Sequence, residues 1–162
     1  MYQIDPEGVE HRSWGVLVRR RFRCPGPDHI WSADGHDKLQ KWGIRIYGFI
    51  DAWSRCILGL FVHVTNHNPR HINLYYFEMV RKCGGFPQYL HTDRGTETGD
   101  MAATHASLHH FFGNLDEQEA LTRHKYTKSV HNQKIECFWS QLMRRHNRGV
   151  VDRLFRAMEE GE

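Results

Sequence analysis

The stretch "WGIRIYGFIDAWSRCILGLFVHVT", residues 42 to 65, decides the fold that we predict for this chain. Its first half alternates apolar and polar positions and places Ile44, Ile46 and Ile50 together, which is the pattern of a half-buried strand. Its second half is a nearly continuous apolar run, and the Ser-Arg step between the halves leaves room only for a tight turn. The segment is therefore predicted to form two antiparallel strands.

The preceding stretch "HIWSAD", residues 29 to 34, supplies a third strand of the same meander. It also alternates, with Ser32 and Asp34 on one face and Trp31 and Ala33 on the other. Asp34 is taken as the residue that ends this strand.

A helix is predicted after the meander, with Asn68 as its N-cap and Pro69 in its first position. Its last turn is basic, and Gly84 and Gly85 stop it. Residues at helical spacing make one apolar face: Ile72, Tyr75, Tyr76, Met79 and Val80.

The rest of the chain alternates strands and helices. The pattern predicts a strand in 86–93, a helix in 99–113, a weaker strand in 120–129 and a helix in 132–146. The expected fold is therefore α/β, with a five-stranded mixed sheet of three antiparallel and two parallel strands, flanked by helices. Sheets of this kind carry function at the carboxyl ends of their strands.

The composition limits the classes of protein to which this chain can belong. The 162 residues suit one globular domain, no apolar run is long enough for a membrane span, and the N-terminus has no signal-peptide pattern. The four cysteines lack metal-ribbon spacing, so reduced intracellular thiols are expected. His105 and His109 could share a zinc ion, but without a third ligand nearby a polar helix face is the preferred interpretation and no zinc site is predicted.

Basic residues gather in three clusters although the net charge is only +3. The clusters are "RRRFR" (19–23), Arg123 with Lys125 and Lys128, and "RRHNR" (144–148). Together they suit a polyanion, because Lys and Arg neutralise phosphates. We divide the chain into a basic lead-in (1–25), a core (26–147) and a C-terminal tail or truncated helix (148–162).

Three acids align with the predicted elements. Asp34 ends the first strand, Asp93 ends the fourth, and Glu136 lies in the first turns of the last helix, on the flank of its apolar stripe. Carboxylates are the ligands that Mg²⁺ prefers, and three of them brought together without a cation would repel one another. Spacing alone is weak support, because the chain has 19 acids.

The motifs themselves resemble a known family. "WSADGHDKL…GFIDAWSR", "LHTDRGTE" and "SVHNQKIECFW" are similar, in this order, to the catalytic core of retroviral-type integrases and related DDE transposases, in particular the integrase-core proteins of eukaryotic mobile elements. The resemblance covers roughly residues 26 to 145 and implies a ribonuclease H-like fold. It also implies that Asp34, Asp93 and Glu136 match the three catalytic, metal-binding acids of the family.

The resemblance has two departures. Asp93 and Glu136 are further apart than in retroviral integrases, which predicts a longer loop in 111–125. Neither the N-terminal zinc module nor the C-terminal DNA-binding domain of full integrases is visible, so we expect a catalytic core, either by itself or as a fragment of a longer protein.

Other acids are weighed against the triad. Asp37 lies three residues after Asp34 and is the alternative first ligand. Asp51 is interpreted as a turn cap with Arg55 as a possible partner, and Glu97 is expected to face solvent or the loop.

Polar neighbours of the triad are candidate DNA-binding residues: His36, Arg94, Thr96, Asn132, Gln133 and Lys134. Asn132 and Gln133 could instead cap the last helix. Lys134 lies on the opposite flank of that helix from Glu136, so it could meet a phosphate but not the same metal, and a solvated lysine is its alternative.

The leading hypothesis is a Mg²⁺- or Mn²⁺-dependent polynucleotidyl transferase and endonuclease that cuts DNA ends with water and joins them to target DNA. Its expected partners are element-end and target DNA and a second copy in a homodimer or higher oligomer, with no membrane. The alternatives are a domesticated, non-catalytic DNA-binding or interaction module, and a ribonuclease H-type nuclease, for which a fourth carboxylate is lacking. A nuclear location is expected if the source is eukaryotic, and otherwise an intracellular one.

Overall fold

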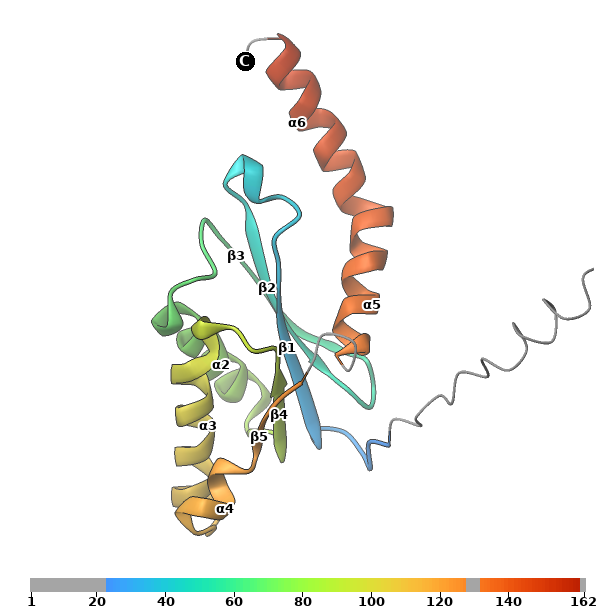
Figure 1. Cartoon of the computed structure of the whole chain (residues 1–162). Coiled ribbons are helices and arrows are strands. Elements are labelled where there is room, and N and C mark those ends of the chain that lie inside the picture. The colour runs from blue at the N-terminus through green and yellow to red at the C-terminus, as the bar shows by residue number, and fades with distance from the viewer. Residues whose placement is uncertain (1–22, 128–131, 161–162) are drawn as a thin grey trace, which may run out of the picture.

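The computed structural model describes residues 23–127 and 132–160. Its centre is one mixed sheet with the strand order β3-β2-β1-β4-β5 (Figure 1). β1, β2 and β3 pair antiparallel, while β4 is parallel to both β1 and β5. The strands are β1 (Ile30–His36), β2 (Arg45–Asp51), β3 (Ile57–His63), β4 (Tyr89–Thr92) and β5 (His124–Tyr126).

Helices cover both faces of this sheet. In Figure 1, α2 and α3 lie on one side of the strands and α5 lies on the other, continuing into α6. The helices are α2 (Pro69–Cys83), α3 (Gly99–Phe112), α4 (Glu117–Leu121), α5 (Gln133–Leu142) and α6 (Arg148–Glu160), with a π-helical segment, Met143–Asn147, between the last two. Two short 3-10 turns, η1 (Gln40–Trp42) and η2 (Thr96–Thr98), follow β1 and β4. The predicted α/β, ribonuclease H-like architecture is confirmed.

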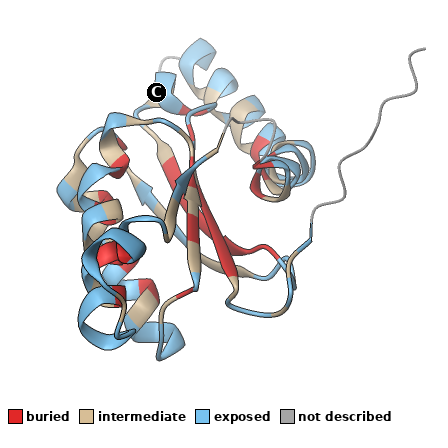
Figure 2. Cartoon of the chain, turned by 60° about the horizontal axis from the view of Figure 1, so that its bottom comes forward, coloured by how far each residue is buried: buried red, intermediate tan, exposed pale blue. Residues whose placement is uncertain are grey.

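Strand alternation divides the buried residues between two cores. Trp31 and Ala33 of β1 pack toward α2 and α3, together with Phe49. Ile46 and Ile50 of β2 pack on the other face, against α5. The predicted alternation is therefore confirmed, and Figure 2 shows buried residues gathered along the central strands.

The limits of α2 follow from its end residues. The Asn68 side chain accepts a hydrogen bond from the backbone N–H of Arg70 at 3.1 Å, and Pro69 occupies the first helical position. Gly84 ends the helix with a φ of 71°, a conformation that costs glycine little. The predicted cap and stop are thus both observed.

Two elements differ from the sequence-based expectation. β1 does not end at Asp34 but continues to His36, because its pairing with β2 extends to Ile46. The region 111–125 is not a plain loop, since it contains α4, whose N-cap Asp116 accepts from the backbone of Glu119.

The pair His105 and His109 does not make a polar helix face. Both are buried, with 0% and 3% of their surfaces exposed. His105 contacts the hydroxyl of Tyr76 at 2.7 Å, and His109 contacts the carbonyl oxygen of Pro87 at 3.0 Å. Two buried polar rings therefore join α3 to its neighbours.

Parts of the predicted basic clusters, Arg19 to Arg21 and Lys128, lie outside the described residues. Within the described ranges, no helix is long and apolar enough to cross a membrane.

Candidate active site

Asp34 lies two residues before the end of β1 and faces α5. Its Oδ2 accepts a hydrogen bond of 3.0 Å from the indole N–H of Trp139 on that helix. The indole reaches this position because Gly48, the β2 residue paired with Asp34, has no side chain. A Cβ at Gly48 would come within 2.7 and 2.9 Å of two indole carbons. The close approach of β2 and Trp139 therefore fixes one oxygen of Asp34.

The electrostatics of Asp34 link it to the other two predicted acids. The pKa of Asp34 is raised to about 7, mainly by burial, next by the negative charge of Asp93, and least by that of Glu136. The hydrogen bond from Trp139 acts in the opposite direction. Both other acids therefore act electrostatically on the Asp34 carboxylate.

The three acids come from distant parts of the sequence and lie on or next to three elements that are neighbours in the fold. Asp93 directly follows β4, which runs parallel to β1 with Ser32 opposite His91. Glu136 lies in the first turn of α5, which packs against β1 and β2, and it is exposed. Asp34 and Asp93 are half-buried.

The three carboxylates do not form a ready-made metal site. Across 23–127 and 132–160, no three His, Cys, Asp or Glu side chains are grouped so that they could hold a metal ion. The donor chemistry nevertheless suits Mg²⁺ or Mn²⁺, which prefer carboxylate oxygens. The repulsion at Asp34 is what a divalent cation would neutralise.

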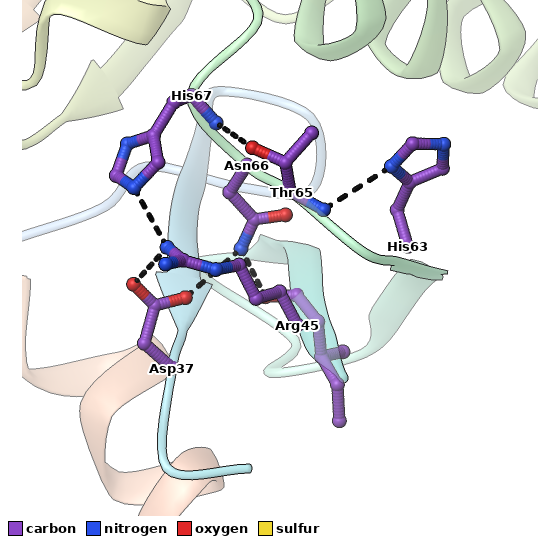
Figure 3. A network of polar contacts seen from close by, with 7 residues as sticks. Asp37, Arg45, His63, Thr65, Asn66 and His67 are labelled. Carbon is purple, nitrogen blue, oxygen red and sulfur yellow. Dashed lines mark hydrogen bonds and ion pairs between the residues drawn. The ribbon is translucent and has the colours of Figure 1, made fainter. Parts of the chain in front are cut away.

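Asp37, the alternative first ligand, is engaged elsewhere. Figure 3 shows Arg45 between Asp37 and His67, with distances of 2.9 Å to the carboxylate Oδ2 and 2.8 Å to the His67 Nε2. The amide of Asn66 donates to the other oxygen of Asp37 and to the carbonyl of Ile46. Asp37 therefore ties the end of β1 to the loop after β3.

Asp51 caps the turn between β2 and β3, as predicted. Its carboxylate accepts from the backbone N–H and hydroxyl of Ser54 and from the backbone N–H of Asp28. Arg55 joins this turn through its backbone N–H, which donates to the Asp51 carbonyl at 2.8 Å. The Asp51 carboxylate has these partners in place of the suggested Arg55 side chain.

Glu97 faces the loop that follows β4, as expected. It is half-buried, and its carboxylate folds back over Gly95, where any Cβ would collide with it. The charges of Asp34, Glu97 and Asp93 all act on the buried hydroxyl of Tyr47. Burial, followed by these charges, raises the pKa of Tyr47.

Three of the predicted DNA-binding residues, His36, Arg94 and Thr96, occupy two different environments. His36 is buried and stacks on Trp139, with ring centroids 4.9 Å apart. Arg94 and Thr96 are exposed in the turn that follows Asp93. This turn leaves both side chains accessible at the edge of the candidate site.

The other predicted DNA-binding residues, Asn132, Gln133 and Lys134, lie at the start of α5. Asn132 is 3% exposed, and its side chain does not cap the helix but donates to the carbonyl of Ala33 at 3.4 Å. Gln133 and Lys134 line a hollow of about 460 Å³ on the flank of α5, and Glu136 lines a different hollow. The predicted separation of Lys134 from Glu136 is thus observed.

Two residues that hold the site were not identified as functional from the sequence. Trp139 was assigned only to the apolar stripe of the last helix, and Gly48 only to a strand. The available signal was the spacing of Glu136 and Trp139. Residues three positions apart are neighbours on a helix, so the indole was expected to lie close to the acid.

The chain is similar to a known family of proteins. A family model described as "Integrase core domain" matches residues 21–162. No curated protein matches the chain.

Proposed function

Because the chain belongs to the integrase core domain family, we propose that it is a metal-dependent polynucleotidyl transferase that cuts DNA and transfers DNA strands. Membership of the family supports an integrase- or transposase-type function. The proposal of metal-dependent cleavage and strand transfer rests on the three acids Asp34, Asp93 and Glu136. The observation that carries it is the position of Asp34, held by Trp139 and repelled by both Asp93 and Glu136.

Asp34 and Asp93 would hold Mg²⁺ or Mn²⁺ jointly, and Glu136 would complete the site. Such ions activate the attacking oxygen and stabilise the leaving oxygen of an in-line phosphoryl transfer. The chain itself orients the donors. The Trp139 N–H fixes Asp34, and the Asn132 amide joins the start of α5 to β1, so that Glu136 is carried toward the other acids.

DNA is the proposed substrate, as element ends and as target. Arg94 and Thr96, exposed beside Asp93, are placed to contact a phosphate, and such contacts set the register of a bound strand. Gln133 and Lys134 would contact DNA on the other flank of α5. A homodimer or higher oligomer is part of this proposal, since two DNA ends must be joined to one target.

One observation favours a second function, a non-catalytic DNA-binding or interaction module derived from an integrase. The acids in the described ranges are not gathered into a metal-binding group. A module without catalysis would not need them to close around an ion.

Nicking of supercoiled plasmid by the full chain in Mn²⁺ or Mg²⁺ distinguishes the two functions. Asp34→Asn and Glu136→Gln should each reduce nicking by more than about a hundredfold, because even groups that only orient metal ligands account for tenfold to a hundredfold. Glu78→Gln, an exposed acid of α2 on the opposite face, is the matched control and should nick like the wild type.

Thermal unfolding with and without Mn²⁺ supplies a readout that does not depend on activity. Mn²⁺ should raise the melting temperature of the wild type and of Glu78→Gln, but not that of Asp34→Asn, because a ligand stabilises the state that binds it. Unchanged nicking by Asp34→Asn would overturn the assignment. Plasmid binding without nicking or metal stabilisation would establish the module.

A further inference from the structure

The contacts between β3 and α2 follow a regular order. While the position in the strand decreases by two, the position in the helix increases by four, because two strand residues and one helical turn each advance about 6–7 Å. The two elements therefore run antiparallel and side by side. The pairs in contact are His63 with His71, whose ring centroids are 4.8 Å apart, Phe61 with Tyr75 at 4.3 Å, and Gly59 with Met79.

Cys83 and Cys56 occupy the next positions in this order. Cys83 is the last residue of α2 and lies one turn after Met79. Its neighbour Lys82 donates a hydrogen bond of 2.9 Å to the backbone carbonyl of Leu58. The last turn of α2 therefore lies against the start of β3, and Cys56 directly precedes that strand.

A shift of register at the start of β3 places Cys56 on the face that α2 covers. After the shift Ile57 pairs with Ile50 and packs on the α5 side, and successive residues of a strand point to opposite faces. The backbone carbonyl of Cys56 accepts a hydrogen bond of 3.0 Å from the N–H of Asp51. Asp51 in turn pairs with Trp31, which packs on the α2 side. Cys56 and Cys83 therefore face the same space between β3 and α2.

Both thiols are free and exposed, and they interact electrostatically. The pKa of Cys83 is raised mainly by burial, next by the charge of Asp28, and least by the charge of Cys56. A disulfide needs Cα atoms about 4.4–6.8 Å apart. Both cysteines stand at the ends of elements, where the backbone adjusts most readily: Gly84 and Gly85 follow Cys83, and a turn precedes Cys56.

We propose that Cys56 and Cys83 form a redox modification site, at which a low-molecular-weight disulfide such as oxidised glutathione converts the two thiols into a disulfide bond. One thiolate attacks the oxidant, forms a mixed disulfide and releases one reduced glutathione. The other thiolate attacks the protein sulfur of the mixed disulfide and releases the second. The two protons of the protein thiols pass to the two glutathione thiolates, so one oxidised glutathione is reduced for each bond formed.

The bond ties β3, an edge strand of the sheet, to the helix that covers it. It closes a loop that contains both elements, and such a closure restricts the unfolded chain and so stabilises the folded one. Cys56 lies beside the start of β1, whereas Asp34 lies near its other end. The inference therefore does not depend on the proposed function.

The test exposes the reduced, folded full chain to an excess of oxidised glutathione. Intact-mass spectrometry measures hydrogen lost and glutathione added, and peptide mapping without reductant identifies the cysteines that are joined. The wild type should lose the mass of two hydrogen atoms and join Cys56 to Cys83. Its melting temperature should rise by about 5–10 °C and return to the starting value after reduction with dithiothreitol.

Three serine variants locate the bond. Cys83→Ser should keep glutathione on Cys56 as a mixed disulfide, because no second thiol resolves it, and its melting temperature should not rise. Cys56→Ser should keep glutathione on Cys83 in the same way. Cys137→Ser removes an exposed thiol of α5 and is the matched control, so it should form the bond like the wild type.

Glutathione on both Cys56 and Cys83 of the wild type, without a bond between them, would overturn the inference. So would a bond from either of them to Cys24, a bond between two copies of the chain, or a bond that forms only after urea has unfolded the protein. An unchanged melting temperature of the chain that carries the bond would overturn its role in fastening α2 to β3.

Discussion

The first strand, β1, turns different kinds of side chain toward the two faces of the sheet. Toward α2 and α3, β1 contributes Trp31 and Ala33 to an apolar cluster. Toward α5, the same strand contributes Ser32, Asp34 and His36. One strand can therefore stabilise the domain with alternate residues and carry a site with the residues between them.

The faces also differ in how rigid their packing is. On the α2 face, the close neighbour of the strand glycine Gly59 is the flexible end of Met79. On the α5 face, the neighbour of Gly48 is the ring of Trp139, which is bonded to Asp34. The α5 face thus has less freedom to adapt to a change, and each prediction below tests one side of this contrast.

The largest effect is expected in the apolar core. Ile72 of α2 is 0% exposed, and Ile72→Ala should lower the free energy of unfolding by about 2–5 kcal/mol, because it removes buried methyl groups and leaves a cavity. Leu74 on the same helix is 63% exposed, so Leu74→Ala should change it by less than about 0.5 kcal/mol. Urea unfolding followed by tryptophan fluorescence measures both. Equal losses would remove the distinction between the buried and exposed sides of α2.

Substitutions at Gly48 and Gly59 compare the rigidity of the packing on the two faces of the sheet. Gly48→Ala places a methyl group within 2.7 Å of the Trp139 ring, which must move as a unit, and should cost about 1–3 kcal/mol. Gly59→Ala meets the sulfur and methyl of Met79, which can change rotamer, so its cost should be smaller. Thermal unfolding measures the difference, and the tryptophan emission of Gly48→Ala should also change. A larger cost at Gly59 would contradict the contrast.

A pH-dependent effect is expected on the α2 side. Burial lowers the pKa of His105 to about 3, below the value of about 6.5 for an unfolded chain. Between these values the unfolded state binds the extra proton, so the free energy of unfolding falls as pH falls from about 6.5 to 3. One such group contributes a slope of up to about 1.4 kcal/mol per pH unit. His105→Gln should flatten the acid side of the stability curve by this amount, as measured by urea unfolding at several pH values.

Tyr76→Phe separates the burial of His105 from its hydrogen bond. The variant removes the hydroxyl that contacts His105 Nδ1 at 2.7 Å, and should lower stability by about 1–3 kcal/mol. The histidine stays buried, so the slope with pH should remain. An unchanged slope in His105→Gln would show that another group carries the acid sensitivity.

Local patterns predicted much of the architecture. The cap at Asn68, the stop at Gly84 and the alternation of β1 each depend on neighbours in the sequence. The extent of β1 depended on its pairing with β2 and was misjudged, whereas α4 begins at a local cap, Asp116, that was overlooked. One error thus came from a contact between distant segments and the other from a local signal that was overlooked.

The candidate active site was also predicted only in part from the sequence. The sequence order singled out Asp34, Asp93 and Glu136, but not the indole that holds the first acid, because Trp139 is 105 positions away from it in the chain. Likewise, Asp37 was a plausible ligand until Arg45 and Asn66 were seen to engage it.

By itself, the sequence determined the fold class, the family and the order of the three acids, because these depend on local periodicity and on the residue types of short motifs. Only the tertiary structure decided which oxygen of Asp34 is bound by Trp139, and that His36 is buried and stacked on the same indole. The physical reason is that a hydrogen bond and a ring stack depend on positions to within about an ångström, which are set by the packing of α5 on β1 and β2.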